Sequence, residues 1–401
     1  LLGLGTWLAP ASAVAARLGA VLAGLLTLLV LWRFYRRCGL HGRQDQLLAL
    51  VLAAATPAGF IAGVITTPDT VLMLCLALAL HEAAAALDGD RRRWLTAGAA
   101  TGLGLLGKYT MVVIGPVFLW ALLRADPRAL RSPWPYLGGL LALLVFLPHI
   151  LWNAEHDWLT LRFQFGHGFS TETGTASIPL AADVLPTALP LDGDTEPKAH
   201  QPPGDIGARL ASVAGYLGSQ LAFWGLLLIP LALVLLRRGG PARIGRDLAR
   251  TLTPAGRALL IAGTLFPLLF FAILAWFSEV EANWSGMYLA TAAALAAVAL
   301  QHRPLWTLAA AALNLVLIGL YALHAATGLL ALPDAAERII RETRGFDALA
   351  RHAEGLPRPV FADRYQTAAM LNFYAPGIGV GQWPGITRPS EYLRGRIVPI
   401  P

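Results

Sequence analysis

Long apolar runs constrain this chain more than any other feature. Runs that are long enough, or nearly so, to cross a bilayer as helices occupy residues 13–32, 46–65, 70–87, 94–107, 110–123, 134–152, 209–236, 257–278, 285–300 and 305–331. A membrane-spanning helix needs roughly 20 apolar residues, so the two runs within 94–123 are short for spans. Charged residues occupy only 14% of the 401 positions, whereas about a quarter is usual in soluble domains. We predict an all-α polytopic membrane protein with about ten spans.

Arginines gather in alternate connections between these runs. They follow the first, third, fifth, seventh and ninth runs, at 33–43, 91–93, 124–131, 237–257 and 303, while the intervening turns contain almost none. Arginine-rich loops of membrane proteins face the cytoplasm, so we expect the turns near Asp69, Lys108 and Glu281 to face outside. The net charge of +7 then reflects membrane orientation, and we expect no nucleic-acid partner.

The sequence predicts two regions. Residues 1–332 would form the membrane core, with a flexible outer loop at 171–204 that is rich in Pro, Gly and Asp. Residues 333–401 would form a small extracytoplasmic α/β tail, with a helical pattern at 334–354, a short strand at Pro359–Ala362 and a helix at Arg364–Tyr374. Because the first arginine group is expected inside, Leu1 would lie outside, and we expect an upstream span and outer loop that this sequence does not include.

Two ionisable residues at outer turns are candidates for function. Lys108, one of only two lysines, ends an uncharged apolar stretch. A charge near membrane depth is costly unless it snorkels, pairs or serves a function, and in an arginine-dominated chain we favour a phosphate ligand over snorkelling. Asp69 precedes an apolar run. It suits either a helix N-cap or a carboxylate that faces an outer cavity and orients an acceptor hydroxyl or holds a cation, and the sequence favours neither.

Two further outer segments combine aromatic and hydrogen-bonding side chains. Between 148 and 167, Trp152 and Trp158 suit the interfacial aromatic belt. The same segment contains residues suited to sugar recognition, namely Asn153, Glu155, His156, Gln164 and His167. Its histidines match no standard zinc ligand set, so we favour sugar recognition over metal binding. The second segment holds Glu281, Asn283 and Trp284, which equally suit a solvated loop.

A glycine motif in the chain has a simple structural interpretation. Residues 102–107 match the GxGxxG pattern of dinucleotide-binding proteins, but they lie inside an apolar run. Such a site needs a preceding strand, whereas small residues allow membrane helices to pack closely. We predict helix packing here.

Taken in order, several motifs resemble the polyprenyl-phosphate-sugar glycosyltransferases of the GT-C fold, especially the protein-mannosyltransferase-like family that includes the lipid A aminoarabinose transferase. The motifs are Thr67–Asp69, Gly104–Thr110, Trp152–Trp158, Phe163–Phe165, Glu281–Trp284, Ala362–Ala369 and Asn372–Tyr374. The resemblance implies a bacterial inner-membrane enzyme whose active site faces the periplasm or exterior. It implies sugar transfer, with inversion, from a polyprenyl-phosphate donor to a lipid, glycan or protein acceptor.

The resemblance also implies roles for individual residues. Asp69 would be a second acidic group of the catalytic cavity, and Lys108 with Tyr109 would contact the donor phosphate. The substrate would contact Asn153, Glu155, His156, Gln164, His167, Glu281, Asn283 and Trp284. The principal catalytic carboxylate of the family lies in the first outer loop, which this sequence lacks, so the chain alone is expected to be inactive. No cofactor is expected, with a divalent cation as the alternative.

Two other classes of protein are alternatives. A transporter or flippase of a lipid-linked or anionic solute would show internal repeats and polar groups at mid-membrane, whereas the polar residues here cluster at outer turns. A membrane scaffold would use the tail to bind a partner. The clustering at outer turns favours the enzyme.

Overall fold

The computed structural model describes residues 12–158, 160–161, 205–278, 280–331, 333, 340, 342, 344–362 and 365–382. The chain divides into two compact units, of which the first comprises 1–161 and 202–318 and the second 162–201 and 319–401. The predicted outer loop at 171–204 lies outside the described residues.

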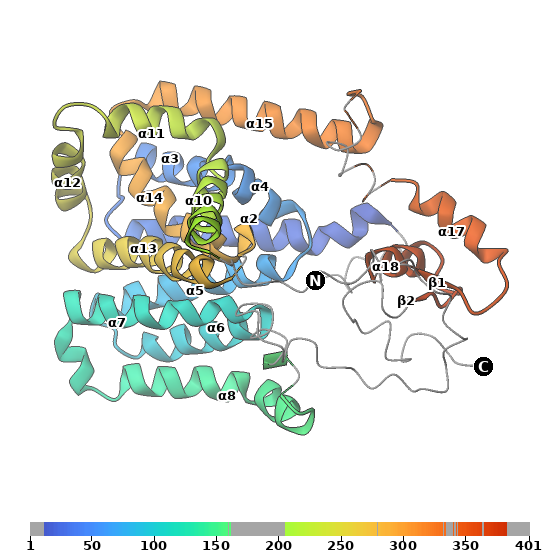
Figure 1. The fold of residues 1–401 in the computed structure, drawn as a ribbon. Coiled ribbons are helices and arrows are strands. Elements are labelled where there is room, and N and C mark those ends of the chain that lie inside the picture. Colours follow the sequence, from blue (N-terminus) through green and yellow to red (C-terminus); the bar gives the residue numbers. More distant parts are fainter. Residues whose placement is uncertain are drawn as a thin grey trace. The chain divides into compact units, whose positions relative to one another are not determined.

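The first unit is helical (Figure 1). Its elements, with 3-10 helices labelled η, are α2 (Ala13–Arg37), α3 (Arg43–Ala54), α4 (Pro57–Val64), α5 (Pro68–Leu87), α6 (Arg93–Gly107), η1 (Tyr109–Val113), α7 (Ile114–Ala125), η2 (Pro127–Arg131), α8 (Trp134–Glu155), α10 (Ile206–Ala222), η4 (Gly225–Leu227), α11 (Leu228–Leu235), α12 (Gly240–Thr251), α13 (Pro254–Phe277), η5 (Ala282–Tyr288), α14 (Leu289–Leu300) and the first part of α15 (Pro304–Thr327).

The burial of the helices confirms a membrane protein. The segment Ala282–Leu300, which comprises η5 and α14, lies inside the bundle with 78% of its most apolar window buried, whereas the equivalent windows of α8 and α15 are each only 17% buried. The outer helices therefore expose leucines such as Leu143, Leu144 and Leu317. A soluble protein rarely exposes apolar surface on this scale, but hydrocarbon solvates it.

The described residues contain six to eight candidate spans, compared with about ten predicted for the chain. By length and composition six described helices can cross a membrane, or up to eight if two bent helix pairs each form one span. The chain bends by 75° between α3 and α4, and by 93° between α10 and the η4–α11 segment. Thr56 takes extended backbone angles before Pro57 and caps α4 by accepting from the Gly59 N–H, as expected for a residue before proline. Gly225 marks the second bend with a φ of +56°.

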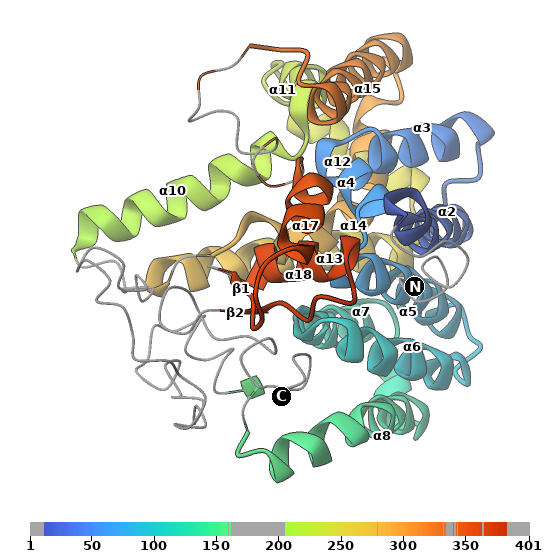
Figure 2. The ribbon, with the colours of Figure 1, turned by 90° about the vertical axis from the view of Figure 1, so that its right-hand side faces the viewer.

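Close contacts between helices depend on small residues. Helix α6 packs against α8 and α5, and α8 lies beside α6 at the edge of the first unit in both views (Figures 1 and 2). A Cβ added to Gly98 would meet the Gly138 carbonyl oxygen at 1.9 Å, and one added to Gly102 would meet the Val145 Cβ at 2.7 Å. These contacts agree with the packing role predicted for the glycine motif.

The described tail is a small α/β structure, as predicted. It contains α17 (Phe346–Glu354), β1 (Phe361–Ala362), α18 (Tyr365–Tyr374) and β2 (Gly381–Gln382). The two strands pair in parallel, with Phe361 opposite Gly381. The Asn372 side chain donates to the Val380 carbonyl at 2.7 Å and accepts from its N–H at 2.9 Å, which fixes α18 beside the chain entering β2.

Candidate functional site

A break in the helical backbone positions the candidate lysine. Helix α6 ends at Gly107, Lys108 is extended with φ −161° and ψ 132°, and η1 begins at Tyr109. The one extended residue separates the end of α6 from η1. The Lys108 ammonium contacts Asp69 at the start of α5, whereas the Tyr109 hydroxyl contacts His149 on α8.

Asp69 connects three segments that are distant in the sequence. Its Oδ1 lies 2.6 Å from the Lys108 Nζ, and its Oδ2 accepts from the Asn283 Nδ2 at 3.1 Å. The N-cap of α5 is Thr67, so the Asp69 carboxylate does not occupy the capping position. The Asp69 and Lys108 side chains are only 18% and 19% exposed. Pairing offsets the cost of removing these two charges from water.

The Lys108 ammonium retains unused hydrogen-bonding capacity. An ammonium carries three N–H donors, and among the described residues only Asp69 accepts from it. Two donors are therefore free to bind an anion without breaking the contact with Asp69. This makes Lys108 a suitable ligand for phosphate.

A cavity of about 600 Å³ borders the Asp69 carboxylate. The residues at its polar end are Thr67, Asp69, Glu281 and Asn283. Lys108 does not line the cavity itself but is bonded to Asp69, which does. Most of the lining is apolar and comes from α2, α4 and α14, for example Val21, Leu25, Leu28, Phe60, Ile61 and Leu289. The cavity can therefore hold an apolar chain that ends in a polar group beside Asp69.

Tyr109 belongs to a second cluster, at the end of α8. The Asn153 Nδ2 donates to the His149 Nε2 at 2.9 Å, the same nitrogen that the Tyr109 hydroxyl contacts. The Asn153 Oδ1 accepts from the Thr160 N–H at 3.1 Å and from its hydroxyl at 2.6 Å. Asn153 is 2% exposed. Its contacts hold the returning chain against the end of α8.

The remaining predicted residues lie in different surroundings. Glu155 is exposed and makes no ion pair within the described segments, whereas His156 stacks on Trp152 with ring centroids 4.2 Å apart. Glu281 is exposed and lines the cavity. Trp284 is half-buried and meets Phe271 edge-on. Gln164 and His167 lie outside the described residues.

The structure adds features that the sequence analysis did not assign. His149 connects Tyr109 with Asn153, and its position four residues before Asn153 on one helix was a usable signal. No local pattern shows that Asn283 bonds to Asp69, because 214 positions separate them. Within the described part of the chain no group of three or more His, Cys, Asp or Glu side chains could hold a metal ion.

Part of the chain is similar in sequence to known glycosyltransferases. Residues 1–152 match the sequence profile described as dolichyl-phosphate-mannose-protein mannosyltransferase. The lipopolysaccharide core galacturonosyltransferase RgtA of Rhizobium johnstonii is 32% identical over 143 residues, which cover 34% of this chain and 29% of the relative.

The fold is similar to that of ArnT from Cupriavidus metallidurans, solved bound to undecaprenyl phosphate. The TM-score is 0.52 at 17% identity, over 93% of this chain and 63% of the other. The chain thus spans less than two thirds of either protein.

Proposed function

We propose that this chain is a GT-C glycosyltransferase that transfers a sugar from a polyprenyl-phosphate donor to a cell-envelope acceptor, and its similarity to known glycosyltransferases supports the proposal. One observation carries the proposal: Asp69, which is paired with the Lys108 ammonium, lines the polar end of a mostly apolar cavity. The acceptor is a lipid, a glycan or a protein. The galacturonosyltransferase similarity, which names a lipopolysaccharide core, supports an acceptor in the envelope.

The cavity suits both parts of such a donor. Its apolar walls would contact the polyprenyl chain, and inside a membrane such apolar contacts are favoured by van der Waals packing. Undecaprenyl phosphate, present in the similar ArnT structure, has this combination of an apolar chain and an anionic head.

The charges at the polar end make binding of this anionic head depend on Lys108. Asp69 and Glu281 both line that end, and two carboxylates would repel a phosphate. Lys108 neutralises Asp69 and offers its free N–H donors to the phosphate oxygens. A lysine suits this task because its ammonium is a compact point charge.

The proposed reaction is a single displacement at the anomeric carbon. The acceptor hydroxyl oxygen forms a bond to that carbon while the bond from the carbon to the phosphate oxygen breaks. The electron pair leaves with the polyprenyl phosphate, and a carboxylate general base takes the hydroxyl proton. Attack opposite the leaving group inverts the configuration. Lys108 would stabilise the negative charge that develops on the phosphate.

In the proposed mechanism Asp69 acts on the donor through Lys108. Its two oxygens are engaged by the Lys108 ammonium and the Asn283 amide, so it holds the lysine at the cavity end. We place this site at the extracytoplasmic face of a bacterial inner membrane, because the connections near Asp69, Lys108 and Asn283 are poor in arginine.

Transfer by the full-length protein in membrane vesicles tests the proposal. The donor would be an undecaprenyl-phosphate sugar labelled in the sugar, and the measurement would be label in the envelope acceptor. We expect Lys108→Ala to lower the rate by about 100-fold or more, the size typical of losing one group that stabilises developing charge.

Arg128→Gln is the matched control, because it removes an exposed positive charge from η2 outside the cavity and should leave the rate unchanged. Unchanged turnover in a folded Lys108→Ala protein would rule out the phosphate role. Movement of the donor across the vesicle membrane without sugar transfer would instead support the transporter interpretation.

A further inference from the structure

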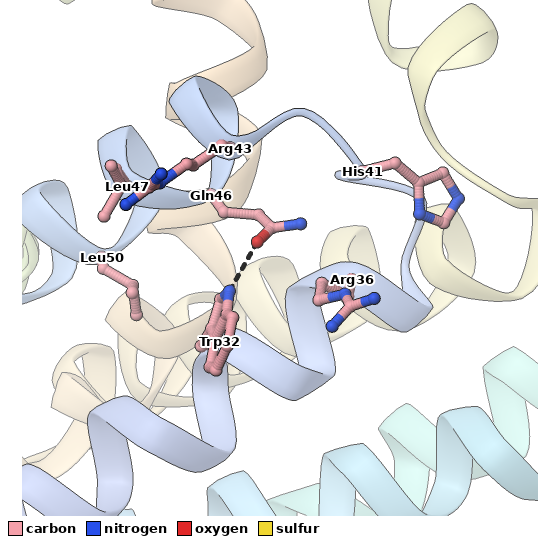
Figure 3. Close-up of a pocket in the computed structure, with 7 residues that line it drawn as sticks. All are labelled: Trp32, Arg36, His41, Arg43, Gln46, Leu47 and Leu50. Carbon is pink, nitrogen blue, oxygen red and sulfur yellow. Dashed lines mark hydrogen bonds between the residues drawn. The ribbon is translucent and has the colours of Figure 1, made fainter.

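A second cavity, of about 470 Å³, lies at the arginine-rich end of α2 and α3. Figure 3 shows its lining: Trp32 and Arg36 come from α2, His41 from the turn after it, and Arg43, Gln46, Leu47 and Leu50 from α3. None of these residues belongs to the proposed transfer site. We call this cavity the basic groove.

The wall of the basic groove is held by a buried amide. Gln46 is 6% exposed, and its Oε1 accepts from the Trp32 Nε1 at 2.5 Å (Figure 3). Its Nε2 donates to the Leu40 carbonyl oxygen at 2.6 Å. These two bonds fix α3 against α2 and hold the indole ring at the surface, where it is 38% exposed. The groove therefore has a built polar wall.

The cationic side chains of the groove lack acidic partners. Arg36, His41 and Arg43 are exposed, and none of them forms an ion pair with any described residue. The groove contains no carboxylate. The neighbouring Arg37 differs, because it donates to the His81 Nε2 at 3.2 Å and lies 3.8 Å from Asp88. The unpaired positive charge suits an anionic ligand.

The groove also has an apolar side. Leu47 is 53% exposed, and Leu50 lines the groove beside it. On α2, Leu29 is 41% exposed and lies one turn before Trp32, on the same helix face. Cationic side chains next to an exposed indole and leucines match a lipid headgroup with its attached chain, whereas a free phosphate would use only the cationic part.

We propose that the basic groove binds one anionic phospholipid. The headgroup phosphate lies between Arg36, Arg43 and His41, and an acyl chain lies along Leu47 and Leu50. Basic pockets between membrane helices on the cytoplasmic side bind anionic headgroups, and the arginine-rich connections predict that side for this end of the bundle. The lipid is distinct from the sugar donor and independent of the transfer reaction.

Lipid titration of the full-length protein tests the proposal. Native mass spectrometry in neutral detergent would compare short-chain phosphatidylglycerol, phosphatidylcholine of equal chain length and inorganic phosphate. We expect saturable binding of phosphatidylglycerol alone. Because each arginine near an anionic lipid contributes about five-fold in affinity, Arg36→Gln with Arg43→Gln should weaken binding by roughly 25-fold.

Arg33→Gln is the matched control, since Arg33 is exposed on α2 but does not line the groove, and it should leave the affinity nearly unchanged. Arg36→Lys with Arg43→Lys should keep most of the affinity, which shows that charge is the cause. An equal loss of lipid affinity in Arg33→Gln would mean that the positive charge acts diffusely, and it would rule out a specific site in the basic groove. Inorganic phosphate that binds as tightly as phosphatidylglycerol would overturn the lipid assignment.

Discussion

The two ends of α5 both carry carboxylates, but their partners differ. Near the last turn, Glu82 Oε1 lies 2.9 Å from the His81 Nδ1, and its Oε2 accepts from Arg93 at 2.9 Å and from the Thr96 hydroxyl at 2.5 Å. In the first turn, the Asp69 carboxylate bonds to Lys108 and Asn283 and to no other described side chain. One carboxylate joins a network within the protein, and the other lies at the edge of a cavity.

Burial does not distinguish these two ends. The Glu82 side chain is 13% exposed and that of Asp69 is 18% exposed. The difference lies in the cations. The Arg93 guanidinium bonds to both Glu82 and Asp90, whereas the Lys108 ammonium keeps two N–H donors that bond to no described residue. Charged groups whose partners all lie within the protein stabilise the fold. A half-buried ammonium with free donors beside an apolar cavity suits a ligand.

Among the variants that test this difference between the two ends of α5, Asp69→Asn should have the largest effect on the sugar-transfer rate. The amide keeps the shape of the side chain but removes the charge that holds Lys108, so we expect the transfer rate to fall by about 10- to 100-fold, the loss of one charge-assisted contact. Folding should persist, because Thr67 is the N-cap of α5. Initial rates with the labelled donor, alongside thermal unfolding, would measure both.

The control for Asp69→Asn is Asp90→Asn, which changes a 58% exposed carboxylate at the opposite end and should not alter transfer. Full activity in Asp69→Asn would mean that Asp69 only favours the start of α5 through its charge.

A change at the opposite end should reverse this pattern. Glu82→Gln leaves His81 without its carboxylate partner and Arg93 with Asp90 as its one remaining acidic partner among the described residues, so we expect the free energy of unfolding to fall by about 1–3 kcal/mol. The sugar-transfer rate per folded molecule should stay at the wild-type value. Thermal unfolding in detergent measures the first quantity and the vesicle assay the second. A loss of transfer as large as that in Asp69→Asn would show that the two ends are not functionally distinct.

The sequence predicted the class of fold because hydropathy acts locally. Apolar runs and arginine-rich connections identify membrane helices one by one, and the strand and helix of the tail lie within a few residues of their predicted bounds. The bends were missed because run length was given more weight than Thr56–Pro57 and Gly225, which interrupt two of the runs. Local signals for both bends were therefore present.

The site was only partly predictable for a different reason. Lys108 and Asp69 stood out as charges beside apolar runs, and each was identified separately. Their pairing, and the bond from Asn283, depend on how α5, the α6–η1 break and η5 pack together. The same holds for the cavity, whose walls come from helices on both sides of the 153–208 segment. Single-sequence patterns contain no record of such contacts.

Asn283→Ala gives the smallest expected change in the proposed site. It removes a neutral donor from the Asp69 Oδ2, but Asn283 is exposed, so water can replace the amide. We therefore expect transfer to fall by only about three- to ten-fold, equivalent to one ordinary hydrogen bond. Gln44→Ala, at an exposed amide of α3 outside both cavities, is the control. Asn283→Asp should lower the transfer rate more than Asn283→Ala does, because a second negative charge beside Asp69 would compete with the donor phosphate for Lys108. If Asn283→Asp and Asn283→Ala had equal transfer rates, charge at this end of α5 would not govern donor binding. The proposed functional difference between the two ends of α5 would then be wrong.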